Sequence, residues 1–248
     1  MTLLAATHRQ RRLLDLQALD TRLDQIAHRK ATLPEGRALQ ERASALAELN
    51  IEVVRVQTAH GDVQREVTKA ETGVELVRNR SARNQARLDS GQGSPKDLQA
   101  LQHEIGSLAR RQAELEEIEL EVMERAESLE HELAALRGAR DAMALEVDQL
   151  AAARDSAVAV LDEEAAGLRA ARAELLPEIG EDLLVLYEKV RSASGGVGAA
   201  ALQHRRCEGC RLELNQVDLG RIAAAAPDEV VRCEECRRIL VRTPESGV

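Results

Sequence analysis

A seven-residue apolar repeat over residues 95–176 limits the fold of this chain more than any other feature. Apolar residues recur there at alternating spacings of three and four on one unbroken register. They are Leu98, Leu101, Ile105, Leu108, Leu115, Val122, Ala126, Leu129, Leu133, Leu136, Met143, Val147, Leu150, Ala157, Leu161, Leu168, Ala171 and Leu175. Sustained over about 11 heptads, this pattern is typical of a coiled-coil helix whose a and d positions face a partner.

The preceding part of the chain carries a second repeat of the same kind. Its a and d positions are Leu46, Leu49, Val53, Val56, Val63, Val67, Ala70, Val74, Val77 and Leu88, with His60, Ser81 and Asn84 as polar exceptions. Between Leu16 and Leu33 the repeat is shifted by two residues, and the shift falls at Pro34–Gly36. Proline removes a helical hydrogen-bond donor and glycine loosens the backbone, so we expect a kink or short break at about residues 34–36.

A glycine-rich segment, Ser90–Pro95, joins the two repeats. Ser94 is placed to cap the following helix, and Pro95 to occupy its first position. The arms, residues 3–89 and 95–176, are nearly equal in length, which predicts an antiparallel hairpin with its turn at about residues 90–95. A parallel dimer of extended arms is the alternative, but the matched lengths and the glycine turn argue against it.

Composition also favours a mainly α fold. The 248 residues include no Phe, no Trp and one Tyr, Tyr187, so long helices with a narrow apolar seam fit better than a compact core. Pro177 is expected to end the second arm, before a short helix at about residues 178–191 and a flexible linker at Ser192–Gly198. The predicted domains are a kinked helical hairpin over residues 1–192 and a second module over residues 193–248.

Four cysteines define this second module: Cys207, Cys210, Cys233 and Cys236 form two C-x-x-C pairs separated by 22 residues. Two such knuckles suit the tetrahedral coordination of one structural Zn²⁺ by four thiolates. Short alternating apolar stretches around them predict the strands of a zinc ribbon, with a helical insert near Leu219. Because the module has few large apolar side chains, we expect it to need the metal in order to fold.

Other interpretations of the cysteines fit less well. A thioredoxin-like redox pair requires a βαβ setting, which the sequence lacks. Two disulfides would require export, and no signal sequence is present. A catalytic zinc needs an open coordination position and usually a His or water ligand, whereas His204 could at most replace a thiolate.

The charge balance bears on partners and location. The net charge is −9, whereas residues 195–248 carry eight Arg and eight acidic residues, so the negative excess lies in the helical part. An acidic chain is not a general nucleic-acid binder. There is no apolar run of membrane-spanning length and no signal peptide at the start, so we expect a cytoplasmic protein that does not enter the membrane.

Basic residues gather in two places. One group is near the hairpin turn: Arg78, Arg80, Arg83, Arg87 and Lys96. The other surrounds the cysteines: Arg205, Arg206, Arg232, Arg237 and Arg238. Both groups are candidate contacts for phosphates or for an acidic protein surface, with an ordinary solvated face in an arginine-rich chain as the competing interpretation. No aromatic side chain is available there to stack on bases, which argues against single-strand binding.

No catalytic arrangement can be named. Gly91–Lys96 lacks the spacing of a phosphate-binding loop and follows a helix rather than a strand. The many carboxylates occupy positions typical of solvated helix faces, and neither a Ser/His/Asp nor a Cys/His nucleophile pattern is present. We therefore expect that the protein is not an enzyme.

Several segments carry a resemblance to a known family. They are Ser94–Ile105, Leu115–Glu124, Leu183–Arg191, Cys207–Cys210 and Pro227–Leu240. Together they resemble the bacterial C4-type zinc-ribbon proteins with an N-terminal coiled-coil hairpin. The resemblance implies that the four cysteines are the zinc ligands. It also implies an adaptor, since some relatives in flagellated or secretion-competent bacteria bind an alternative sigma factor, secretion components or a messenger RNA.

One position departs from the family pattern. Members often have Gly directly after the last cysteine, where this chain has Arg237, so we expect some strain in the second knuckle. Two functions remain open: a non-enzymatic adaptor that binds a protein partner, and a nucleic-acid-binding protein that uses the basic ribbon. The sequence allows either a monomer or a weak dimer.

Overall fold

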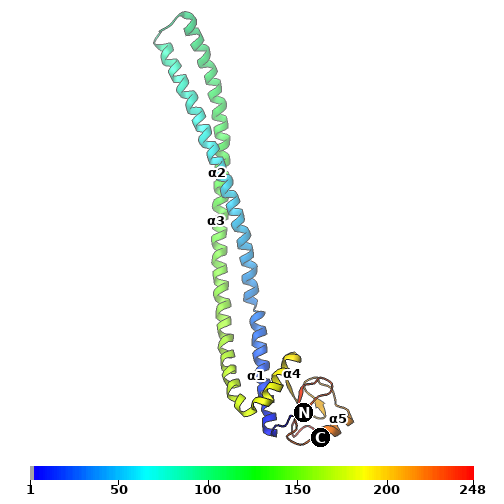
Figure 1. Cartoon of the computed structure of the whole chain (residues 1–248). Coiled ribbons are helices and arrows are strands. Elements are labelled where there is room, and N and C mark those ends of the chain that lie inside the picture. Colours follow the sequence, from blue (N-terminus) through cyan, green and yellow to red (C-terminus); the bar gives the residue numbers. More distant parts are fainter. Residues whose placement is uncertain (1–2) are drawn as a thin grey trace. The chain divides into compact units, whose positions relative to one another are not determined.

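The computed structural model describes residues 3–248, which divide into two compact units. The ribbon unit comprises the described residues up to Arg37 together with Ala152–Val248, and the hairpin unit comprises Ala38–Ala151. The helices and strands are α1 (Thr7–Ala31), α2 (Pro34–Asp89), α3 (Pro95–Ile179), α4 (Glu181–Ala193), β1 (Ala199–Gln203), β2 (Arg206–Cys207), α5 (Gln216–Ala224), β3 (Val231–Arg232) and β4 (Ile239–Arg242) (Figure 1).

In the hairpin unit, α2 and α3 run antiparallel (Figure 1). Their heptad seams pack against each other. Val53 and Val56 pack with Leu133, and Val67 packs with Val122 and Ala126. The helices are joined at residues 90–94, where Ser94 and Asp97 cap one another: Asp97 accepts from the Ser94 backbone N–H at 3.0 Å, and the Ser94 hydroxyl accepts from the Asp97 N–H at 3.3 Å. The predicted coiled-coil hairpin is confirmed.

The expected break in the first arm is also present. Helix α1 ends at Ala31 and α2 begins at Pro34, so the interruption lies at residues 32–33, just before the predicted position. Pro34 begins α2 instead of breaking it, because the first helical residue has no intrahelical partner for its N–H.

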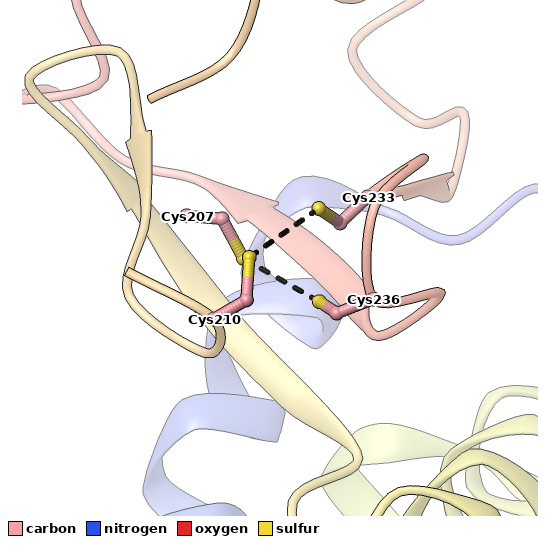
Figure 2. A group of neighbouring side chains, drawn as sticks. All are labelled: Cys207, Cys210, Cys233 and Cys236. Atoms are coloured by element: carbon pink, nitrogen blue, oxygen red, sulfur yellow. Dashed lines mark hydrogen bonds between the residues drawn. The ribbon is translucent and has the colours of Figure 1, made fainter. Parts of the chain in front are cut away.

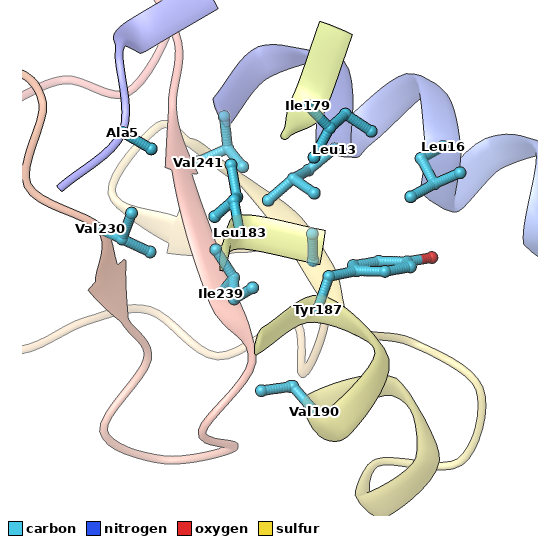
Figure 3. Close-up of a cluster of buried hydrophobic side chains, with 11 residues drawn as sticks. Ala5, Leu13, Leu16, Ile179, Leu183, Tyr187, Val190, Val230, Ile239 and Val241 are labelled. Carbon is cyan, nitrogen blue, oxygen red and sulfur yellow. The ribbon is translucent and has the colours of Figure 1, made fainter. Parts of the chain in front are cut away.

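The largest core of the ribbon unit among the described residues is shared by helices α1, α3 and α4 and the strands. It is built from Ala5, Leu13, Leu16, Ile179, Leu183, Tyr187, Val190, Ala199, Val230, Ile239 and Val241, all less than 9% exposed (Figure 3). Helices α1 and α4 and the end of α3 therefore pack directly on β1 and β4. The sheet order is β2-β1-β4-β3, with β1 parallel to β4 and the other pairs antiparallel.

The expectation that Pro177 ends the second arm is wrong. Helix α3 continues to Ile179, and the chain turns at Gly180, whose φ is +83°. A proline so close to the C-terminus of a helix removes only one hydrogen bond. A side chain at residue 180 is disfavoured by this φ, and its Cβ would lie 1.8 Å from the Arg9 guanidinium. Arg9 would then have to move and give up its 2.6 Å hydrogen bond to the Ile179 carbonyl.

The segment expected to be a flexible linker is held in place. Gln17 on α1 donates to the Gly196 carbonyl at 3.0 Å and accepts from the Gly198 N–H at 2.7 Å. Arg238 donates to the carbonyls of Ser194 and Val197 at 2.8 and 3.1 Å. Composition predicted flexibility because it contains no information about these long-range partners. The ribbon is consequently joined to the helices by a rigid connection.

None of the helices between residues 3 and 248 combines the length and the apolar character needed to cross a bilayer.

Candidate metal centre

The two C-x-x-C knuckles have the same backbone structure. In the first, the Arg211 N–H donates to the Cys207 carbonyl at 2.7 Å and the Cys207 N–H to the Leu212 carbonyl at 3.0 Å. In the second, the Arg237 N–H donates to the Cys233 carbonyl at 2.9 Å and the Cys233 N–H to the Arg238 carbonyl at 3.0 Å. Each knuckle is thus a tight turn that directs both of its thiols to one side.

Both turns place an arginine in the left-handed region of backbone space. The φ of Arg211 is +62° and that of Arg237 is +61°, immediately after Cys210 and Cys236. A side chain with a Cβ is disfavoured there by about 1–2 kcal/mol relative to glycine. The strain expected at Arg237 therefore has a physical basis, and Arg211 shares it.

The four sulfurs lie together between the knuckles (Figure 2). All are within 4.8 Å of one another, and the Cys207–Cys236 and Cys210–Cys233 sulfur pairs are each 3.9 Å apart. A tetrahedral zinc with bonds of about 2.3 Å requires sulfurs separated by about 3.8 Å. The cluster therefore fits one Zn²⁺ with all four coordination positions filled by thiolates, which is a structural rather than a catalytic arrangement.

The chemistry of the thiols also fits a cation. Burial is the main cause that raises the pKa of Cys207, although the Cys210 and Gly209 backbones hydrogen-bond to it. Burial likewise raises the pKa of Cys233, and hydrogen bonds from the backbones of Cys236 and Glu235 lower it by less. Ionised sulfurs at these positions need a compensating positive charge, and a bound zinc would supply it.

The cluster has its own small core. Cys207 and Cys233 pack with Ala200, Leu202, Leu214, Leu219, Ile222 and Leu240. Helix α5 contributes Leu219 and Ile222, and Asn215 caps it by accepting from the Asp218 N–H at 2.8 Å. The helical insert near Leu219 was therefore correctly predicted. These few side chains bury little apolar surface. The free energy of zinc binding therefore contributes to the folding of this region.

His204 does not take part in the cluster. Among residues 3–248, the four cysteines are the one group of potential ligands close enough to share an ion. His204 is exposed and lies with Arg205 in a left-handed turn, at φ values of +47° and +65°.

Of the basic residues singled out near the cysteines, Arg238 points inward. Besides its two bonds to the Ser194–Val197 segment, it donates to the Gly209 carbonyl of the first knuckle at 3.2 Å. Arg237 pairs with Glu234 at 3.0 Å, and Arg232 donates through Nε to the Arg237 carbonyl at 2.7 Å. Arg206 is exposed and Arg205 is partly covered. Arg238 is therefore a structural residue that joins the metal centre to the helices.

The basic residues near the hairpin turn are exposed, and two are paired across the hairpin. Arg78 pairs with Glu116 and Arg80 with Glu104, the latter at 2.5 Å. The other three, Arg83, Arg87 and Lys96, are also exposed.

Sequence reasoning missed two features of the ribbon. Arg242 donates to five backbone carbonyls, those of Ile222, Ala225, Ala226, Pro227 and Glu229. In addition, the start of the chain pairs with the ribbon: the Ala5 N–H donates to the Asp228 carbonyl at 2.7 Å and the Val230 N–H to the Leu3 carbonyl at 3.0 Å. Both depend on contacts between distant parts of the chain, for which neither segment carries a local signal.

Comparison with known proteins agrees with this architecture. A family model described as a CT398-like coiled coil hairpin domain matches residues 16–195, and one described as a C4-type zinc ribbon domain matches residues 206–240. The uncharacterised protein Rv2229c of Mycobacterium tuberculosis is 39% identical over 238 residues, which cover 96% of this chain and 97% of that protein.

Solved structures show the same fold. A Mycobacterium smegmatis structure matches with a TM-score of 0.87 and 38% identity, over 97% of this chain and 100% of that one. The structure of CT398 from Chlamydia trachomatis matches with a TM-score of 0.73 over 95% of this chain and 98% of that one. Its identity of 16% supports a likeness of fold alone. Together with the cysteine geometry, these matches identify a C4-type zinc ribbon with one structural zinc.

Proposed function

Because the chain belongs to the family of CT398-like coiled-coil hairpin proteins with a C4-type zinc ribbon, we propose that it is a non-enzymatic adaptor whose ribbon binds a protein partner. Zinc acts as a structural element that fixes the shape of the binding surface. We further propose that it works in the cytoplasm, where thiols remain reduced and available to the metal.

The observation that carries this proposal is the rigid attachment of the ribbon to the helices. Ile239 and Val241 of β4 are at most 1% exposed and pack with Leu13 and Leu183 in the shared core. Arg238 adds hydrogen bonds from β4's start to the connecting segment. A surface held in this way loses little conformational freedom when a partner binds, which favours affinity.

The geometry gives less support to the nucleic-acid alternative. Arg238 and Arg242 donate to backbone carbonyls, so their guanidinium groups build the ribbon itself. The ribbon sequence carries equal numbers of Arg and acidic residues over residues 195–248. Phosphate binding depends on a surplus of accessible positive charge, which such a module supplies only locally.

Photo-crosslinking in the source cell tests the adaptor proposal. A photoreactive residue placed at exposed Val217 on α5 should capture a protein, and the capture should survive nuclease and raised salt. The same probe in a Cys207→Ser, Cys233→Ser chain should lose the product, because the ribbon no longer folds. Capture of nucleic acid alone, or a protein product that is unchanged in the cysteine variant, would contradict the proposal.

A further inference from the structure

A groove on the ribbon lies between the end of α5, the segment leading into β3, and the second knuckle. It has a volume of about 420 Å³, within the range of small-ligand sites. Its lining includes Arg221, Arg232, Arg237, Glu229, Glu234 and Val231. Three guanidinium groups and two carboxylates thus line the groove together with alanine and valine side chains.

The groove already holds one carboxylate. Glu234 is paired with Arg221 at 2.6 Å through one oxygen and with Arg237 at 3.0 Å through the other. Arg221 is the main cause that lowers the pKa of Glu234. Two arginines from different elements therefore converge on a carboxylate, which is the geometry in which guanidinium groups recognise acidic side chains.

Arg232 provides a further donor group. Its Nε donates to the Arg237 carbonyl, and no hydrogen bond or ion pair occupies its terminal nitrogens within residues 3–248. The side chain is partly buried, so its position is set by packing and by this bond. A guanidinium that is held through Nε and has open terminal donors, in a groove also lined by apolar side chains, is suited to a carboxylate on a chain that also carries apolar residues.

The walls are rigid. On one side, β3 pairs with β4, with Val231 opposite Leu240 and Arg232 opposite Ile239. On the other, Arg242 of β4 holds the end of α5 and the following turn through the carbonyls of Ala225 and Glu229, at 2.9 and 2.8 Å. Both walls are therefore anchored to the same strand, next to the metal centre.

From these observations we propose that this groove is the partner site of the ribbon, and that it binds an acidic protein segment in which carboxylates alternate with apolar side chains. This inference rests on the proposed adaptor function. An incoming carboxylate replaces Glu234 between Arg221 and Arg237, while a second carboxylate of the same segment forms an ion pair with Arg232. The exchange is easy because the Glu234 pairs are solvent-exposed, and such pairs contribute little on their own.

The proposal can be tested on the zinc-loaded full chain with labelled probes and fluorescence anisotropy. The probes are a short peptide of alternating glutamate and valine, the same peptide with lysine in place of glutamate, and a single-stranded oligonucleotide of equal negative charge. We expect the acidic peptide to bind best. Arg221→Ala and Arg232→Ala should each weaken it about tenfold, as expected for loss of one charge-assisted contact.

Glu234→Gln is the informative variant, since it should strengthen peptide binding by about fivefold by releasing two arginines. Arg206→Ala is the matched control, because β2 lies at the opposite edge of the sheet from β3. Arg221 is exposed and has no other ion pair within the described residues, so Arg221→Ala should fold even if Arg232→Ala disturbs the knuckle.

Three results would overturn the groove: no binding by either the wild type or Glu234→Gln, equal weakening by Arg206→Ala, or a preference for the oligonucleotide that depends on Arg232. The adaptor proposal fails separately. A crosslinked partner whose contacts lie outside the groove would support the adaptor function and contradict the groove as its site. Peptide binding in the groove without any captured partner would support the groove and contradict the adaptor function.

Discussion

The hydroxyl of Tyr187 donates a 2.7 Å hydrogen bond to Oδ2 of Asp20, and both side chains are almost completely buried. Asp20 also accepts from Arg172 Nε at 2.7 Å. The three residues come from α4, α1 and α3, so one polar cluster joins these three helices within the ribbon unit. A buried carboxylate requires such partners, since an unpaired charge there would be strongly destabilising.

Tyr187→Phe should lower the free energy of unfolding of the ribbon unit by about 1–2 kcal/mol, because it leaves part of Asp20 without its donor. Chemical denaturation followed by circular dichroism measures the change. A double-mutant cycle with Asp20→Asn separates the hydrogen bond from loss of packing. Additive effects in the cycle would show that the Tyr187–Asp20 bond is not the source of the stability.

The same pair makes the unit sensitive to alkaline pH. Burial, followed by the hydrogen bond to Asp20, raises the pKa of Tyr187 above its ordinary value of 10.0. The stabilisation is thus fully present below about pH 10, where the unfolded phenol is still protonated, and declines as pH rises above that value. Unfolding measured between neutral and strongly alkaline pH should show a steeper loss for the wild type than for Tyr187→Phe. Parallel curves would refute this linkage.

Metal removal should affect the two units differently. Chelation, or Cys233→Ser, should unfold the ribbon and disturb α1 and α4, because Ile239 and Val241 complete the core on which those helices pack. The hairpin unit has its own seams and should retain its helical circular dichroism. Tyr187 is the sole aromatic residue of the chain, so its fluorescence reports on the ribbon unit alone. Loss of helical signal throughout the chain would contradict this division.

The left-handed arginines offer a stabilising change. Arg211→Gly and Arg237→Gly should each raise the free energy of unfolding of the zinc-loaded protein by about 1 kcal/mol by relieving strain at φ near +60°. Arg206→Gly, at a strand position, is the control and should destabilise by about 0.5–1 kcal/mol. If all three variants lose stability, the arginine side chains stabilise the knuckles more than their backbone strain destabilises them.

The sequence allowed the hairpin and the cysteine centre to be predicted because each is specified locally. The seam residues repeat at a fixed spacing, and each C-x-x-C pair forms its own turn. By contrast, the shared core joins Leu13 to Val241, and Gln17 binds the segment ending at Gly198. Such pairings arise only when distant segments meet, and the composition of Ser192–Gly198 by itself predicts a flexible linker. For the same reason, the sequence predicts a partner contact at Arg238, whose hydrogen bonds to Ser194, Val197 and Gly209 depend on distant segments.

Gln17 provides a direct test of the rigid connection on which the adaptor proposal depends. Its amide bridges the Gly196 carbonyl and the Gly198 N–H. The Tyr187 hydroxyl, whose proton is donated to Asp20, lies 3.2 Å from the Gln17 amide oxygen. Gln17→Ala removes the bonds to Gly196 and Gly198, together with those to Thr21 and the Ala199 N–H. It leaves buried backbone groups unsatisfied, so the segment should open more often. Limited proteolysis should then cut near Gly195–Gly198 at least tenfold faster, since about 1.4 kcal/mol corresponds to a factor of ten in the open population. Gln40→Ala, at an exposed position of α2 in the hairpin unit, is the matched control and should cut at the wild-type rate. Equal rates for Gln17→Ala and the wild type would mean that Arg238 alone suffices to hold the segment, and Arg238→Ala would then be expected to release it.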